Sequence, residues 1–119
     1  MGTGPTNPIM AELIRQLKAA AISQRAPLWK ALASELEKPT RKRREINLSK
    51  ITKFAKPGEL IVVPGKVLGG GELKQPVRIA AWAFSGQARR KIEAAKSEAL
   101  DLAELLARKP KLAELRVLV

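Results

Sequence analysis

Leu60-Ile61-Val62-Val63 is a continuous apolar run, with Pro57-Gly58 before it and Pro64-Gly65 after it. Isoleucine and valine favour extended backbone, and proline and glycine favour turns. A short apolar run between turn residues is typical of a strand that is buried on both faces. The run therefore predicts a central strand over residues 60–63. A very short second strand at Val67-Leu68 and a turn at Gly69-Gly70-Gly71 should follow.

Helical patterns precede this strand. Asn7 is a good N-cap, and Pro8 suits the first position of a helix. We expect that helix to bury one face, formed by Ile9, Leu13, Leu17 and Ala20. A second helix should begin at Pro27 and end before Pro39, with an apolar face of Leu28, Leu32, Ala33 and Leu36. Asn47 should cap a short third helix with Leu48, Ile51, Phe54 and Ala55 inward and Ser49, Lys50 and Lys53 outward.

Strands and helices alternate in the rest of the chain. Residues 77–84 read as a strand, and Ser85 should cap a helix over residues 86–95. Ser97 should cap a last helix with Leu102, Leu105 and Leu106 in the core, and residues 115–119 read as a terminal strand. This order predicts an α/β fold with a helical N-terminal half. We expect one domain over residues 1–119 with a flexible tail at 1–6; a boundary near the basic segment is the alternative.

The segment from residue 38 to 56 holds most of the charge. It contains eight basic residues and one acid, so it contributes +7 of the net +12. Arg41-Lys42-Arg43-Arg44 has no apolar face and is expected to be an exposed connection. Such charge runs are usually solvated surface, but adjacent like charges repel one another, and a free protein gains nothing from them. The segment 38–56 therefore predicts contact with a polyanion.

Other basic residues give weaker indications. Arg89 and Arg90, followed by Lys91, could form a second patch on the helix after Ser85. Lys66 precedes the glycine run, where it could reach a phosphate; a purely structural turn is about equally consistent with the sequence. The order of residues around Lys66 does not fit the phosphate-loop template of nucleotide-binding proteins. Arg108, Lys109 and Lys111 lie near a helix C-terminus, where the helix dipole is a sufficient reason for them.

The composition argues against most enzymes. The chain has no cysteine and no histidine, which removes the usual zinc, copper and haem ligands and the commonest nucleophile–base pairs. The acids are spaced as on helix surfaces. We therefore expect no catalytic residue, no cofactor and no metal. The four aromatic residues fit core packing, and no apolar run is long enough for a membrane span. The N-terminus does not fit a secretory signal.

Several motifs resemble a known family. They are Thr6-Asn7-Pro8, Trp29, Lys38-Pro39-x-Arg41-x-Arg43-x-Glu45-Ile46-Asn47-Leu48-Ser49-Lys50-Ile51, Val62-Val63-Pro64-Gly65-Lys66-Val67-Leu68-Gly69 and Ala83-Phe84-Ser85. In this order they resemble the archaeal large-subunit ribosomal proteins of the eighteen-e family, from about residue 6 onward. The resemblance implies a fold shared with large-subunit ribosomal protein fifteen, an irregular superhelix of β-β-α turns preceded by helices.

The resemblance also implies a function and a set of contacts. It implies a structural constituent of the large ribosomal subunit that holds ribosomal RNA in the cytoplasm, beside neighbouring ribosomal proteins and without a small-molecule substrate. The expected RNA contacts are Lys38, Arg41, Lys42, Arg43, Arg44, Lys50, Lys53, Lys66, Arg89 and Arg90. The alternative is an archaeal DNA-compacting protein or general nucleic-acid chaperone. A small enzyme acting on RNA would lack any acid–base set.

Overall fold

A computed structural model describes residues 7–39 and 44–118. The contacts divide the chain into two compact units, residues 1–43 and residues 44–119. The expected tail at residues 1–6 and the cations Arg41, Lys42 and Arg43 lie outside the described residues. The single-domain prediction concerns cooperative folding, so it stays a prediction. The predicted α/β class, with helices ahead of the strands, is confirmed.

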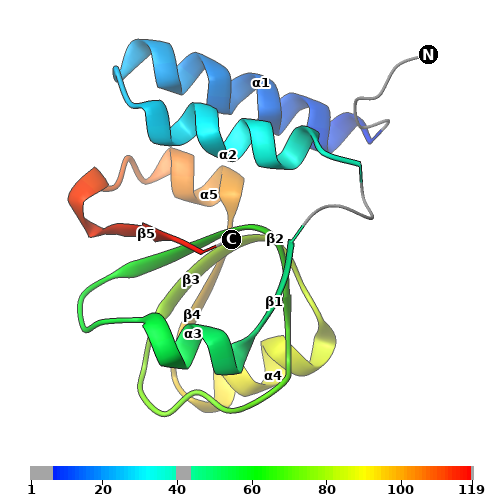
Figure 1. Ribbon diagram of the computed structural model, residues 1–119, viewed down its shortest axis with the longest axis vertical. Helices are drawn as coiled ribbons and strands as arrows, with labels where there is room; N and C mark the ends of the chain where they lie inside the picture. Colours follow the sequence, from blue (N-terminus) through cyan, green and yellow to red (C-terminus); the bar gives the residue numbers. More distant parts are fainter. Residues whose placement is uncertain (1–6, 40–43, 119) are drawn as a thin grey trace. The chain divides into compact units, whose positions relative to one another are not determined.

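The first unit is a pair of helices, α1 (Pro8–Ser23) and α2 (Pro27–Glu37), drawn in blue and cyan in Figure 1. Asn7 caps α1 as expected, because its side chain accepts hydrogen bonds from the backbone amides of Ile9 and Met10. The turn between the helices is short because Arg25 adopts a φ of 52°, a left-handed conformation that reverses the chain. Lys18 Nζ on α1 lies 2.8 Å from Glu37 Oε2 on α2.

Most residues of the expected buried faces are confirmed, namely Leu13, Leu17, Leu32, Ala33 and Leu36, but one edge of each face differs. Ile9 is 73% exposed, and Met10 is buried in its place together with Ile14. On α2, Trp29 is buried rather than Leu28. The indole of Trp29 donates to Gln24 Oε1 at 3.0 Å, which satisfies its only polar group. Both errors have one cause: an i, i+4 pattern fixes the stripe of a helix but not its edge.

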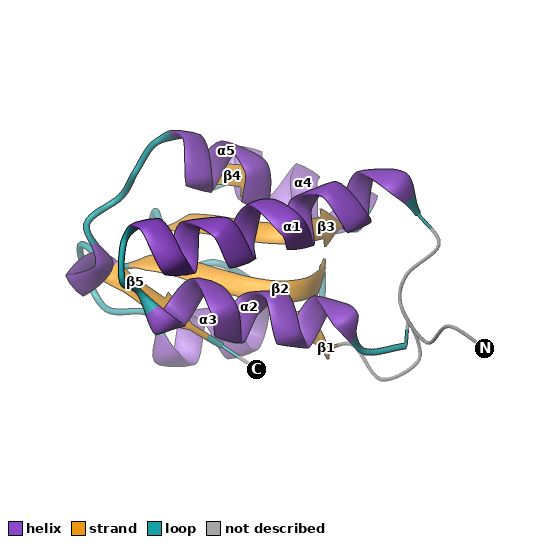
Figure 2. Ribbon diagram, turned by 90° about the horizontal axis from the view of Figure 1, so that it is seen from above, coloured by secondary structure: helices purple, strands orange, loops and turns teal. Residues whose placement is uncertain are grey.

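The second unit is a parallel sheet with three helices and one short 3-10 helix. Its strands are β1 (Arg44–Asn47), β2 (Leu60–Leu68), β3 (Arg78–Phe84), β4 (Glu98–Asp101) and β5 (Leu115–Val117). Its helices are α3 (Leu48–Phe54), α4 (Gly86–Ala94), α5 (Leu102–Ala107) and η2 (Leu112–Glu114). The strand order is β1-β2-β3-β4, and β5 also pairs with β2. All strands run in the same direction (Figure 2).

Strand β2 is longer than expected. Its predicted start at Leu60 is confirmed, but the strand continues through Pro64-Gly65 to Leu68, so Val67-Leu68 is not a separate strand. The pairing with β3 shifts between Val63 and Lys66, where β2 has one extra residue. A bulge of this kind accommodates a proline, which has no amide hydrogen for the ladder. The carboxyl half of β2 therefore pairs with β1, and its amino half pairs with β5.

Two expected boundaries were wrong. Arg44 opens strand β1 instead of ending an exposed connection, and Arg44 itself pairs with Gly65 of β2. Ser97 does not cap a helix: its hydroxyl accepts from the Val77 amide at 2.8 Å, and the unpredicted strand β4 follows. Asp101 caps α5 instead, in a capping box with Glu104. A strand of four residues is too short to show a clear period-2 pattern.

Helices cover both faces of the sheet. Helices α3 and α4 lie below it in Figure 1 and bury Leu48, Ile51, Ala88 and Ile92 against strand residues that include Ile61 and Ile79. Helix α5 packs on β3 and β4 from the opposite face and buries Leu102 and Leu105. Phe54 was expected to point inward, but it is 38% exposed. It is the last residue of α3, where the helix has already left the core.

The Gly69-Gly70-Gly71 loop lies between α3 and α4. The Gly70 amide donates to Asn47 Oδ1 and the Ser49 amide donates to the Gly70 carbonyl, both at 2.9 Å. Asn47 therefore holds the loop instead of capping α3 with its side chain. From the other side, Lys91 Nζ donates to the carbonyls of Gly69 and Gly71 at 2.8 and 2.7 Å. The loop is fixed between two helices by its own backbone groups.

Gly71 should be required for this packing. Its φ is 84°, and a Cβ there would lie 2.5 Å from Ser49 Cβ. Gly71→Ala adds both backbone strain and a clash, so we expect it to lower the free energy of unfolding by about 2–4 kcal/mol. Gly58→Ala is the matched control, because Gly58 has a φ of 83° but no neighbour within 4 Å. It should cost about 1 kcal/mol. Equal losses in urea unfolding would contradict the close approach.

Candidate nucleic-acid interface

Three of the predicted contact residues lie on the two helices that hold the glycine loop. Lys50 follows Ser49 on the α3 side, and Arg89 and Arg90 precede Lys91 on the α4 side. All three side chains are exposed. The guanidinium of Arg89 lies 5.1 Å from the centre of the Phe84 ring, a cation–π distance that orients it. The bonded loop gives these cations a rigid support at the carboxyl end of the sheet.

Arg44 and Lys66 lie on β1 and β2, in the same half of the sheet. Arg44 is exposed and makes no ion pair with any described residue. Lys66 is exposed as well, and its partner in the strand register is Glu45. Because Ile46 and Val67 are buried under α3 and α4, Glu45 and Lys66 point to the opposite face. The Lys66 side chain therefore points away from the face of the sheet that α3 and α4 cover.

Other predicted contacts have structural partners. Lys38 Nζ lies 2.9 Å from Glu35 Oε2, at the end of α2. Lys53 Nζ lies 5.5 Å from the centre of the Phe54 ring at the end of α3. The positions of Arg41, Lys42 and Arg43 are outside the described residues. Lys50, Arg89 and Arg90 therefore lie on the two helices that hold the glycine loop, and Lys53 is also on α3. Arg44 and Lys66 lie on strands β1 and β2.

Lys91 has a structural role that its position in a basic triplet of the sequence does not indicate. Besides the two glycine carbonyls, its ammonium lies 3.2 Å from Glu72 Oε1. Three acceptors use all three N–H groups of a lysine. The side chain is half-buried, unlike those of Arg89 and Arg90. The basic triplet on α4 is therefore one structural lysine beside two exposed arginines, a difference that no charge count could detect.

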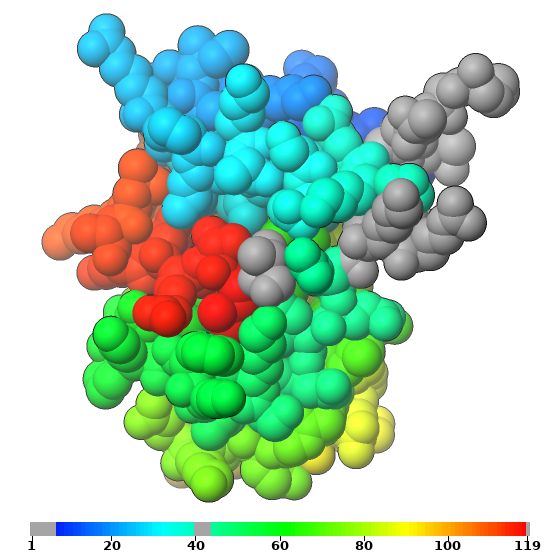
Figure 3. All heavy atoms as spheres, viewed as in Figure 1, coloured from blue at the N-terminus to red at the C-terminus, as the bar shows by residue number. Residues whose placement is uncertain are grey.

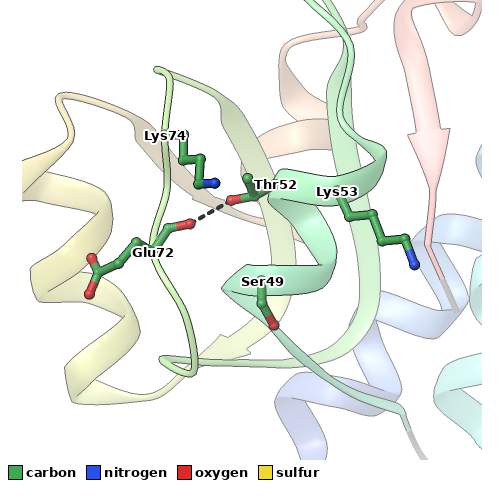
Figure 4. A pocket seen from close by; sticks show the side chains of 5 residues that line it. All are labelled: Ser49, Thr52, Lys53, Glu72 and Lys74. Atoms are coloured by element: carbon green, nitrogen blue, oxygen red, sulfur yellow. Dashed lines mark hydrogen bonds between the residues drawn. The ribbon is translucent and has the colours of Figure 1, made fainter.

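Figure 4 shows a pocket of about 290 Å³ beside α3, lined by Ser49, Thr52, Lys53, Glu72 and Lys74. Thr52 Oγ1 donates to the Glu72 carbonyl at 2.6 Å, which ties the loop to the helix. Lys74 points toward Thr52, whereas Lys53 extends the other way (Figure 4). The Ser49 hydroxyl and the Lys74 ammonium line this pocket, and both groups commonly donate to phosphate oxygens. Lys74 is an exposed cation that the sequence analysis missed, because nothing but a turn surrounds it in the sequence.

In Figure 3 the green atoms of α3 and of the segments that follow it form one unbroken surface in the lower part of the view. Several described acids are occupied by cations: Arg15 lowers the pKa of Glu12 by donating hydrogen bonds to it, and the bond from Arg108 to Glu98 raises the pKa of the arginine. The described acids contain no cluster of three that could hold a metal ion.

Within the described ranges, none of the helices has the length and the apolar composition that a membrane crossing needs. This finding concerns residues 7–39 and 44–118. The predicted contact cations of the sheet unit are exposed and lie on regular helices and strands, an arrangement that suits an extended anion such as a phosphate backbone.

The chain is similar to ribosomal proteins. The family model for the ribosomal proteins 50S-L15 and 50S-L18e and their 60S counterpart matches residues 26–100. A protein of Methanopyrus kandleri is 46% identical over 98% of this chain and 95% of its own length. Proteins of Methanococcus maripaludis and Archaeoglobus fulgidus are 46% and 44% identical over 89% and 96% of this chain, and over 88% and 97% of their own lengths.

All three relatives are named large ribosomal subunit protein eL18. The resemblance to the archaeal eighteen-e proteins is therefore confirmed. Large-subunit ribosomal proteins of archaea are cytoplasmic, which agrees with the predicted location. The family match covers α2 and the sheet unit from β1 to all but the last residue of β4. The chain belongs to the family of large-subunit ribosomal proteins that comprises L15, L18e and their 60S counterpart.

Proposed function

We propose that the chain is a structural constituent of the large ribosomal subunit that binds ribosomal RNA mainly through phosphate groups. Its family membership supports the ribosomal role. The proposed contacts are the predicted cations from Lys38 to Arg90, with Lys74 added from the pocket. Neighbouring ribosomal proteins are the other partners, and the role includes no chemical reaction.

The observation that supports this function best is the set of exposed cations on the helices that hold the glycine loop, namely Lys50, Arg89 and Arg90. The loop's backbone groups are bonded to Asn47, Ser49 and Lys91, so the loop is already ordered without RNA. Cations on an ordered support lose little further entropy when a phosphate backbone binds. Arg90 on α4 and Arg44 at the start of β1 are exposed and make no ion pair within the described part of the chain, so neither has an ion-pair partner to displace.

The aromatic residues favour phosphate contact over stacking on bases. Trp29 is fully buried, and Trp82 and Phe84 are half-buried. Phe54 alone among the described aromatic rings is classed as exposed, and Lys53 lies against it. Proteins that read single-stranded RNA use several exposed rings on a sheet. This chain instead offers charge and shape, which suit the backbone of folded RNA.

Binding to a ribosomal RNA fragment should weaken steeply with salt, because each phosphate contact releases a counterion. Arg44→Gln with Arg90→Gln should reduce the slope of log affinity against log salt by about 2, which corresponds to roughly one unit for each lost contact. Lys18→Gln with Lys30→Gln on α1 and α2 removes the same charge and should change the slope little. Fluorescence anisotropy over a salt series measures both. A parent slope near zero would refute the electrostatic mode.

The contribution of Arg41, Lys42 and Arg43 can be tested in cells. Changing Arg41, Lys42 and Arg43 to Gln should leave thermal stability within about half a kcal/mol for each change, since the sequence predicts an exposed connection there and exposed substitutions cost little. Incorporation into large subunits should fall, because three proposed phosphate contacts are lost together. Sucrose-gradient sedimentation with quantitative blotting measures this. A parent protein that follows DNA, rather than large subunits at one copy each, would instead support the DNA-compacting alternative.

A further inference from the structure

Four lysines lie at the edge where the strands begin, which we call the amino edge. It is on the left of Figure 1, opposite the edge with the glycine loop. Lys56 precedes β2, Lys96 precedes β4, and Lys109 and Lys111 lie between α5 and β5. All four are exposed, and none makes an ion pair with a described residue. We call them the amino-edge lysines.

Arginine–glutamate pairs hold the segments of this edge together. Each pair joins two different segments: Arg108–Glu98 at 3.1 Å links the C-cap of α5 to β4, Arg78–Glu114 at 3.9 Å links β3 to η2, and Arg116–Glu59 at 3.7 Å links β5 to the turn before β2. Arg78 Nη2 also donates to the Gly58 carbonyl in that turn, at 3.0 Å. The four lysines are therefore carried by segments that contact one another directly or through one neighbour.

The same pairs leave the lysine charges uncompensated. The three acids at this edge, Glu59, Glu98 and Glu114, are each occupied by an arginine. One further acid, Glu93, lies in the last turn of α4, and it makes no ion pair with a described residue. Four lysine charges against one carboxylate give the edge a local excess of positive charge. A free protein is not stabilised by such an excess.

Backbone strain gives an independent indication at two of these lysines. Lys96 and Lys109 have φ values of 57° and 47°, in the left-handed region. Each follows the C-cap of a helix, the position at which glycine is strongly preferred because it has no Cβ. The Lys96 amide donates to the Glu93 carbonyl and the Ser97 amide to the Ile92 carbonyl, the bonds of a Schellman motif. Glycine would form the same turns without strain.

We propose that the amino-edge lysines bind a second segment of RNA phosphate backbone, so that the sheet unit bridges two RNA segments held at its opposite edges. This inference rests on the proposed RNA-binding function and extends it to residues outside the predicted contacts. A binding role for the charge explains why lysine, rather than glycine, occupies the left-handed position after α4 and after α5. A favourable interaction with the helix dipole is the competing reason for cations there.

The chemistry of the edge favours nucleic acid over a protein partner. Lysine is depleted in protein interfaces, whose binding energy comes from buried aromatic and apolar anchors. Two large apolar side chains near these lysines are exposed, Leu112 at 40% and Phe54, two residues before Lys56, at 38%, and Lys53 lies against the Phe54 ring. Flexible lysine ammonium groups instead act as point charges that suit phosphates in many geometries. An RNA backbone supplies those phosphates at regular spacing.

The strain argument has a direct test. Lys96→Gly with Lys109→Gly removes two left-handed lysines, so the melting temperature should rise by a few degrees. RNA affinity of the same variant should fall several-fold more than that of the Lys18→Gln, Lys30→Gln variant, which loses the same charge. A lower melting temperature, with unchanged RNA affinity, would show that these cations serve the helix ends alone and would overturn the inference.

Bridging can be measured with two copies of one short RNA hairpin, labelled with a donor and an acceptor dye. The parent protein should bring both copies into one complex and give energy transfer. The variant Lys56→Gln, Lys96→Gly, Lys109→Gly, Lys111→Gln should still bind one hairpin but give no energy transfer. Circular dichroism at the same concentration shows whether the variant is folded, and the two glycine changes should keep it so.

Each outcome of the bridging experiment has a defined meaning. A parent that binds only one hairpin, or a four-fold variant that keeps full energy transfer, would overturn the inference while leaving the proposed function intact. A parent that binds no hairpin at all would overturn the proposed function, and this inference with it. Loss of energy transfer in both the four-fold variant and the Arg44→Gln, Arg90→Gln variant, each with one hairpin still bound, would support two separate binding edges.

Discussion

The continuity of β2 through Pro64 and Gly65 is the constraint on which the sheet unit depends. Strand β1 pairs with the residues after the bulge and β5 with the residues before it, so both use the same edge of one strand. Strand β3 occupies the other edge along the length of β2. If the chain turned at Pro64, β1 would have no partner, and the glycine loop would lose the Asn47 side chain that holds it. The bulge preserves both contacts.

The sequence predicted the buried, periodic parts of the fold and the electrostatic character of the surface. Residues 60–63, the Asn7 and Ser85 caps and the outward lysines of α3 followed from local rules, because each depends on neighbours in the chain. Strands β1 and β4 could not be predicted in this way. Arg44 and Glu98 are extended because β2 and β3 lie beside them, and such pairing is invisible in four residues of sequence.

The same limit applies to the candidate site. The charge density of the sequence indicated a polyanionic partner, and the family resemblance indicated ribosomal RNA as that partner. Neither could separate Lys91, whose ammonium is consumed by three acceptors, from Arg90 beside it, which is exposed. The lysines at residues 96 and 109 were equally hidden, since their φ values are set by the turns they occupy. The function of a cation in this chain depends on its partners in space, and a count of charges gives only their sum.

The pairing of β5 with β2 has a consequence for synthesis. Leu115 lies beside Leu60, so the amino half of the central strand keeps one edge without a partner until residues 115–117 have left the exit tunnel of the translating ribosome. Strand β1 needs no such delay, because a single short helix and a turn join it to β2. During translation the amino half of β2 therefore has one unpaired edge. Until β5 pairs with it, this apolar strand can associate wrongly with other chains.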